Sequence, residues 1–131
     1  MYNMTALNQY QSVDLETRVA NASPHILISM LLDGALKKIA LAKGATARGD
    51  IPLRGNSLSA AITIVDSLRA ALDLNAGGEL AENLQALYSY MERRLVEANR
   101  KADPDIMTEV GELIYEIKTG WDNMPFAGRR L

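Results

Sequence analysis

The fold is decided by residues 23–49, whose sequence is SPHILISMLLDGALKKIALAKGATARG. Ser is favoured before a helix, and Pro is tolerated at its first position because an N–H there would have no partner in the helix. Gly49 after Arg48 is typical of a helix end. We therefore predict one long helix from Pro24 to Arg48. Its main apolar stripe, at helical steps of three and four residues, is Leu27, Met30, Leu31, Ala35, Ile39 and Ala42.

The first half of this helix is apolar on nearly every side. Four further apolar residues lie off the main stripe, namely Ile26, Ile28, Leu32 and Leu36. Such a helix is buried against more than one neighbour.

Chain breakers separate three more segments with helical periodicity. The second segment follows Asp50–Pro52 and ends at Asn75–Gly78, the clearest turn in the chain. The third begins near Glu79, and Asp103–Pro104 marks the start of the fourth. The stripes are Leu58, Ala61, Ile62, Val65, Leu68 and Leu72 in the second, Leu80, Leu84, Leu87, Met91, Leu95 and Ala98 in the third, and Ile106, Val110, Leu113, Ile114, Ile117 and Trp121 in the fourth.

Short connections place successive helices side by side, so we predict an all-α protein, an antiparallel four-helix bundle over residues 23–124. Residues 1–22 are expected to form a mobile, partly helical N-terminal segment that can dock. Its apolar strip is Tyr2, Met4, Leu7 and Tyr10, on a segment too short for a stable isolated helix. Residues 125–131 are expected to be a flexible tail.

Composition excludes several classes of protein. A chain of 131 residues with 48% apolar and 23% charged residues is typical of one globular domain. The net charge of -2 provides no basic field for nucleic acid, and the absence of Cys excludes disulfides and thiolate metal sites. We see neither a signal peptide nor an apolar run of about 18 residues, so we expect a cytoplasmic protein without membrane insertion.

Nothing in the sequence converges to do chemistry. Di-iron bundles need Glu-x-x-His pairs, but His25 is the single His and residue 22 is Ala. Glu109, Glu112 and Glu116 share a helical face away from the apolar stripe, which indicates a solvated charged face. With no Gly-rich phosphate loop and no Ser/His/Asp set, we predict no enzymatic activity, no cofactor and no metal.

Extra apolar positions lie beside two of the stripes. They are Ala60, Ile64 and Ala71 in the second helix and Tyr88 and Tyr90 in the third. These residues form either a broadened core or one wall of an exposed groove. A groove of this kind suits an amphipathic partner helix, and the N-terminal segment can occupy it when no partner is present.

At this point the sequence resembles a known family, the flagellar export chaperone FliS. The resemblance extends from Tyr10 to Trp121 and rests on ordered blocks rather than on one motif. The blocks are Ala22–His25, Met30–Ala35, Gly49–Ile51, Gly77–Leu80, Asn83–Leu84, Leu87–Met91, Arg93–Leu95, Ala98–Asn99, Glu109–Val110 and Leu113–Trp121. Two positions depart from the family pattern, with Leu32 where Tyr is common and Ser59 where Lys is common.

The resemblance implies a chaperone that binds the C-terminal segment of unassembled flagellin. Binding in outer hydrophobic grooves would block premature polymerisation in the cytosol, and the complex would be delivered to the export gate of the flagellar type III apparatus. Together with the extra apolar positions, it suggests a flagellin-binding groove formed by Tyr10, Ile64, Leu68, Ala71, Leu87, Tyr88 and Tyr90. A regulatory or co-chaperone partner on another surface is left open.

Two alternatives remain open at this stage. The first is a regulatory helical bundle that sequesters a transcription factor or anti-sigma protein. The second is a structural homo-oligomer that uses the same apolar stripe on itself.

Overall fold

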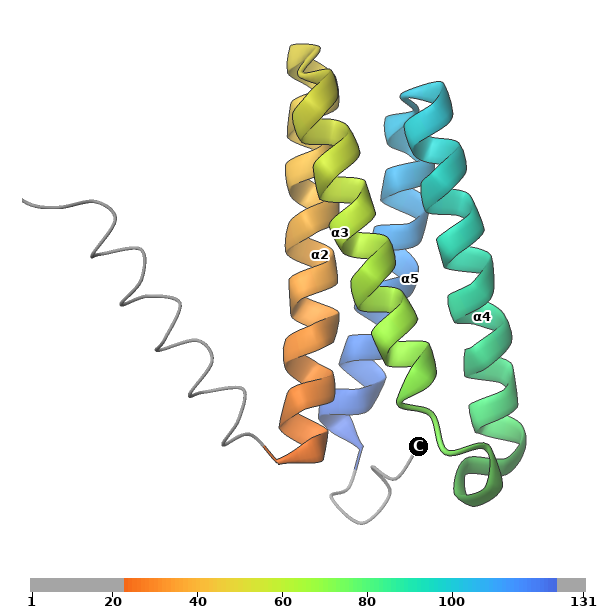
Figure 1. The fold of residues 1–131 in the computed structure, drawn as a ribbon. Coiled ribbons are helices and arrows are strands. Elements are labelled where there is room, and N and C mark those ends of the chain that lie inside the picture. Colours follow the sequence, from red (N-terminus) through yellow and green to blue (C-terminus); the bar gives the residue numbers. More distant parts are fainter. Residues whose placement is uncertain (1–22, 125–131) are drawn as a thin grey trace, which may run out of the picture.

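A computed structural model describes residues 23–124, which form four helices and no strand. The helices are α2 (Pro24–Arg48), α3 (Ile51–Ala70), α4 (Leu74–Lys101) and α5 (Pro104–Asn123). The chain runs up α2, down α3, up α4 and down α5 (Figure 1). Each helix packs against two others, in the cyclic order α2, α3, α4, α5. The prediction of an all-α four-helix bundle is confirmed, while the expectations for residues 1–22 and 125–131 lie outside the described residues.

Most helix ends follow from local backbone chemistry. Gly49 adopts the left-handed region with φ 71°, and its N–H donates to carbonyls of the last turn of α2. The side chains of Asp50 and Asp103 accept hydrogen bonds from first-turn N–H groups of α3 and α5. Ser23 precedes α2 as predicted, but its hydroxyl lies 3.2 Å from Nδ1 of His25 and does not cap the helix.

The start of α4 differs from the prediction. The sequence placed it near Glu79, whereas the structure has an earlier turn beginning at Leu74, capped by the side chain of Asp73. Gly78, with φ 55° and ψ -135°, then interrupts the helix. A side chain would be strained in that conformation, so Gly78 forms a kink within α4, where the sequence predicted that it would end a loop.

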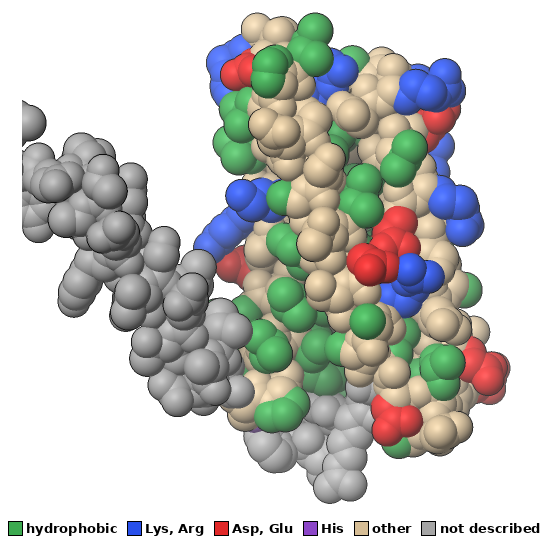
Figure 2. Space-filling model, in the orientation of Figure 1, with side chains coloured by type: hydrophobic (Ala, Val, Ile, Leu, Met, Phe, Trp, Pro, Cys, Tyr) green, Lys and Arg blue, Asp and Glu red, His purple; other side chains and the backbone are tan. Residues whose placement is uncertain are grey.

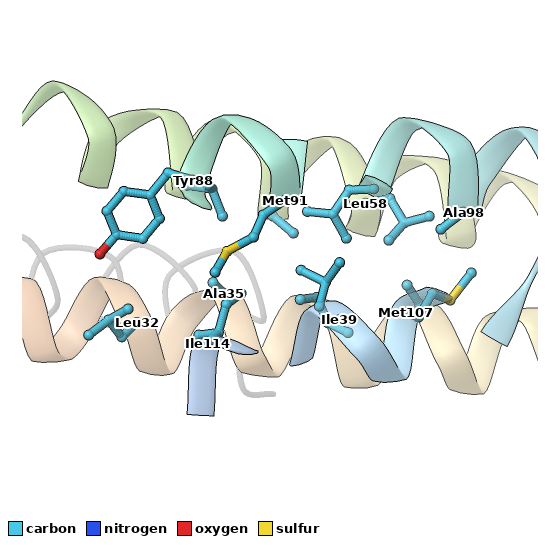
Figure 3. Close-up of a cluster of buried hydrophobic side chains, with 14 of the residues drawn as sticks. Leu32, Ala35, Ile39, Leu58, Tyr88, Met91, Ala98, Met107 and Ile114 are labelled. Atoms are coloured by element: carbon cyan, nitrogen blue, oxygen red, sulfur yellow. The ribbon is translucent and has the colours of Figure 1, made fainter. Parts of the chain in front are cut away.

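The core is one apolar seam along the bundle axis, part of which is shown in Figure 3. Small and large side chains alternate in it, which lets the helices approach closely without leaving voids. The fully buried apolar residues with no exposed area are Leu32, Ala35, Ala42, Ala45, Ala61, Val65, Ala81, Met91, Leu95, Ala98, Met107, Val110 and Ile114.

Two predicted stripes are shifted in the structure. Leu32 was placed off the stripe of α2 but is fully buried, because α2 contacts both α3 and α5. In the first half of α4, Ala81 and Tyr88 are buried where the sequence predicted Leu80 and Leu87, and Leu80 is 49% exposed. At Leu80 the prediction followed the larger side chain, whereas the helix geometry places the smaller Ala81 against its neighbours.

The acidic face of α5 is only partly solvated. Glu109 accepts hydrogen bonds from Arg94 Nε at 2.9 Å and from the Tyr90 hydroxyl at 3.0 Å, so it joins α5 to α4. The Arg94 hydrogen bond holds the pKa of Glu109 below its usual range. Glu112 and Glu116 are exposed, as the sequence indicated.

Two adjacent residues of α4 test the seam. We expect Leu95→Ala to lower the free energy of unfolding by about 2 to 5 kcal/mol, because it leaves a cavity in a fully buried layer. Val96 is 57% exposed, so Val96→Ala should change that free energy by less than about 0.5 kcal/mol. Denaturant unfolding followed by circular dichroism measures both. Equal losses in the two variants would contradict the seam as described.

Candidate binding pocket

An apolar pocket lies among the described residues at the end of the bundle where α2 and α4 begin and α3 and α5 end. Its volume is about 190 Å³. All four helices or their connections contribute to it, so it is a property of the fold rather than of one helix. The lining residues are Ile28, Leu32, Leu68, Ala71, Leu72, Leu80, Leu84, Tyr88, Glu116, Ile117, Gly120, Trp121 and Met124.

Within residues 23–124, the pocket is an end of the core that the four helices do not cover completely. Leu32, Leu68 and Tyr88 are almost completely buried and form its inner wall. Beyond them, the apolar stripes continue towards this end, but the next side chains are only partly buried, namely Ile28, Leu72, Leu84 and Ile117. Figure 2 shows hydrophobic side chains gathered on the lower part of the face formed by α2 and α3.

A hydrogen bond of a buried indole joins α2 and α5 beside the pocket. Trp121 Nε1, near the end of α5, donates to the carbonyl oxygen of His25, in the first turn of α2, at 2.8 Å. The indole is 6% exposed, so this buried N–H has the partner that it needs. The bond fixes the indole as part of the pocket wall.

The opposite rim comes from the connection between α3 and α4. Helix α3 ends at Ala70, and the kink at Gly78 turns the chain into the main part of α4. Leu80 follows directly and is half exposed at the rim. The Gly kink therefore presents an apolar side chain at the mouth of the pocket.

Tyr88 gives the inner wall a polar atom. Its ring reaches from α4 towards Leu32 of α2 (Figure 3). Among the described residues, no hydrogen bond joins its hydroxyl, and no completely buried polar side-chain atom lacks a partner. The hydroxyl therefore keeps access to the pocket, while burial of the residue raises its pKa to about 12.

The described lining of the pocket is mostly apolar. Within residues 23–124, no group of three His, Cys, Asp or Glu side chains is placed to hold a metal ion. Glu116 is the one ionisable lining residue besides Tyr88. No helix among these residues is long and apolar enough to cross a membrane. The walls are suited to apolar side chains of a partner.

The structure brings together only part of the predicted groove. Leu68, Ala71 and Tyr88 line the pocket, with the first and last mainly in the core. Ile64 lies away from it, between α3 and α2, where its Cδ1 approaches Gly34. Leu87 packs against the core outside the pocket lining.

Of the two remaining candidates, only Tyr90 belongs to the described residues. Tyr90 faces α5, where it donates its hydrogen bond to Glu109. Tyr10 lies outside the described residues.

Most of the lining was missed by sequence reasoning. Leu72, Leu84, Ile117 and Trp121 were placed in core stripes, since periodicity alone does not show where a stripe loses its cover. A usable signal was present, because all four predicted stripes continue to the same end of an antiparallel bundle. Met124 and Gly120 carried no signal of their own.

Tyr88 gives a pH-dependent test of the inner wall. An unfolded Tyr has a pKa near 10, and the folded-state pKa of Tyr88 is raised to about 12. The contribution of Tyr88 to the free energy of unfolding is therefore constant below pH ~10. It falls as the pH rises towards ~12, because in that range Tyr88 ionises only in the unfolded state. We expect the free energy of unfolding of the wild type to fall by up to about 1.4 kcal/mol per pH unit more than that of Tyr88→Phe.

Tyr115→Phe is the matched control, since Tyr115 is 63% exposed. Its pH profile should follow the wild type. Urea unfolding at a series of alkaline pH values measures all three proteins. Parallel profiles for Tyr88→Phe and the wild type would show that the Tyr88 ring is not desolvated.

Comparison with known proteins identifies the family of this chain. The family model described as flagellar protein FliS matches residues 6–127. The chain is 48% identical to the flagellar secretion chaperone FliSB of Pseudomonas aeruginosa, over 95% of this chain and 98% of that protein. It is 43% identical to the flagellar secretion chaperone FliS of Salmonella typhimurium, over 92% and 90% respectively.

A third relative, the flagellar secretion chaperone FliS of Vibrio cholerae, is 38% identical over 92% of this chain and 88% of that protein. The names of these relatives agree with the prediction of a protein without enzymatic activity. Matches of this extent, together with the four-helix bundle, confirm the resemblance inferred from the motif blocks. The chain belongs to the FliS family of flagellar secretion chaperones.

Proposed function

We propose that the chain binds the C-terminal segment of unassembled flagellin and that the pocket holds one apolar anchor of that segment. The supporting observation is an open apolar pocket, built by all four helices, in a chain of the flagellar secretion chaperone family. Occupation of the pocket by a segment needed for polymerisation would mask that segment sterically. No ATP or covalent step is required.

Binding of this kind couples ordering of the client to burial of its apolar side chains. A disordered client loses conformational entropy when it orders, which offsets part of the gain from burial. The affinity then stays compatible with release. We propose that the complex forms in the cytoplasm and is delivered to the flagellar export gate, where release occurs.

The regulatory alternative uses the same pocket for a different client. A bundle that sequesters a transcription factor or anti-sigma protein would also present an apolar pocket to a partner helix. The family match favours the flagellin client, because the relatives are named as secretion chaperones. A direct binding measurement separates the two proposals.

Isothermal titration with a flagellin C-terminal segment of about 40 residues tests the proposal. We expect one-to-one binding with a strongly negative heat-capacity change, since apolar burial gives that sign. Leu80→Asp places a charge at the pocket rim and should weaken binding at least about tenfold, or about 1.4 kcal/mol. Because Leu80 is 49% exposed, the bundle should remain folded.

Val96→Asp is the matched control, as it adds the same charge to an exposed site in the other half of α4. It should bind like the wild type. Equal binding by both variants would remove the pocket from the client interface. No binding by the folded wild type would reject the flagellin client and favour the regulatory alternative.

A further inference from the structure

Acidic residues outnumber basic ones in the stretches of the chain that contribute the pocket lining, and Glu116 is itself part of that lining. The three stretches that contribute its lining, residues 24–32, 68–88 and 116–124, contain five acidic and two basic residues. The acidic residues are Asp73, Glu79, Glu82, Glu116 and Asp122, and the basic ones are Arg69 and Lys118. Figure 2 shows acidic side chains at the lower end of α4, with most basic ones above them.

Both basic residues already have acidic partners. Arg69 lies 2.6 Å from an oxygen of Asp66 and 3.5 Å from one of Glu92. Lys118 lies 2.8 Å from Asp122. In the part of the chain that the structure describes, none of the ion pairs includes the carboxylates of Glu79, Glu82 or Glu116. The pocket therefore combines an apolar interior with uncompensated acidic surroundings.

The sequence that follows the described residues has the complementary chemistry. Residues 125–131 are PFAGRRL, with the single Phe of the chain, two Arg and no acidic residue. The last described residue, Met124, itself lines the pocket. Since an extended chain spans at most about 3.6 Å per residue, Phe126 starts within about 7 Å of Met124.

We propose that residues 125–131 dock on this pocket in the free protein. In this arrangement Phe126 enters the apolar interior, and Arg129 and Arg130 lie against the acidic surroundings. The N-terminal segment is the rival occupant suggested by its apolar strip, but residues 1–22 carry Asp14 and Glu16 against a single Arg18. Charge complementarity therefore favours the C-terminal residues, and this inference does not depend on the identity of the client.

Docking of a tethered segment has a direct consequence for partners. A short tether gives an effective concentration in the millimolar range, so a contact with a dissociation constant well below about 1 mM keeps the pocket mainly occupied. A partner must then displace residues 125–131 before it binds. Because the Arg contacts are solvent-exposed ion pairs, salt should weaken the docked state.

Disulfide trapping tests the proposal on the full chain, which contains no native Cys. Ala127→Cys is combined with Leu80→Cys at the pocket rim, so that Phe126 is retained. A disulfide needs Cα atoms within about 7 Å, so it reports close approach. In oxidised glutathione we expect this pair to close at least about tenfold faster than Ala127→Cys with Ile26→Cys.

Ile26 is the matched control because it is 47% exposed, close to the 49% of Leu80, and lies at the same end of the bundle outside the pocket lining. Phe126→Ala, or Arg129→Glu with Arg130→Glu, should slow closure of the Leu80 pair severalfold without slowing closure of the Ile26 pair. Added salt should have the same selective effect.

Two results would overturn the proposal. The first is closure of the Leu80 and Ile26 pairs at rates within about twofold of each other. The second is faster trapping of Leu80→Cys by Gln9→Cys than by Ala127→Cys, which would assign the pocket to the N-terminal segment. Circular dichroism of every variant confirms that the bundle is folded before the rates are compared.

Discussion

The structure depends on burial of one apolar seam shared by four helices. No single helix can bury its stripe alone, and ordering each helix costs conformational entropy that only this shared burial offsets. Small buried residues such as Ala61 and Ala98 let the helices approach closely along the seam that also contains Met91 and Leu95. At one end the seam continues past the point where the helices cover it. The pocket is therefore a consequence of the same stripes that fold the chain.

This origin explains why the pocket is apolar and preformed. Leu32, Leu68 and Tyr88 are held by the core and do not need a partner to be positioned. The Trp121 hydrogen bond to His25 fixes the indole from the other side. A partner side chain would enter a site whose walls are already ordered, so little additional entropy is lost by the chaperone. In the proposed complex, the ordering cost would fall on the client.

Much of the fold could be predicted because its determinants are local. Ser23–Pro24, Arg48–Gly49 and Asp103–Pro104 mark helix boundaries that the structure places at the same residues. The start of α4 could not be predicted in the same way. It depends on the backbone conformation of Gly78, which the residue type alone does not determine. The residues predicted to form one groove lie in different places for a related reason. Tyr90 is amphipathic, and only the position of Glu109 on the neighbouring helix decides that it joins α4 to α5.

The inner wall of the pocket is also part of the core, so any binding there would be coupled to folding. A partner that binds only the folded bundle stabilises it by mass action, so client affinity and chaperone stability are thermodynamically coupled. Truncation of Leu68 or Tyr88 would alter both quantities, since each is part of the core as well as the pocket. Leu80 is different, because half of its surface is already in solvent and the core does not depend on it. The rim of the pocket, rather than its floor, is where recognition can vary without loss of the fold.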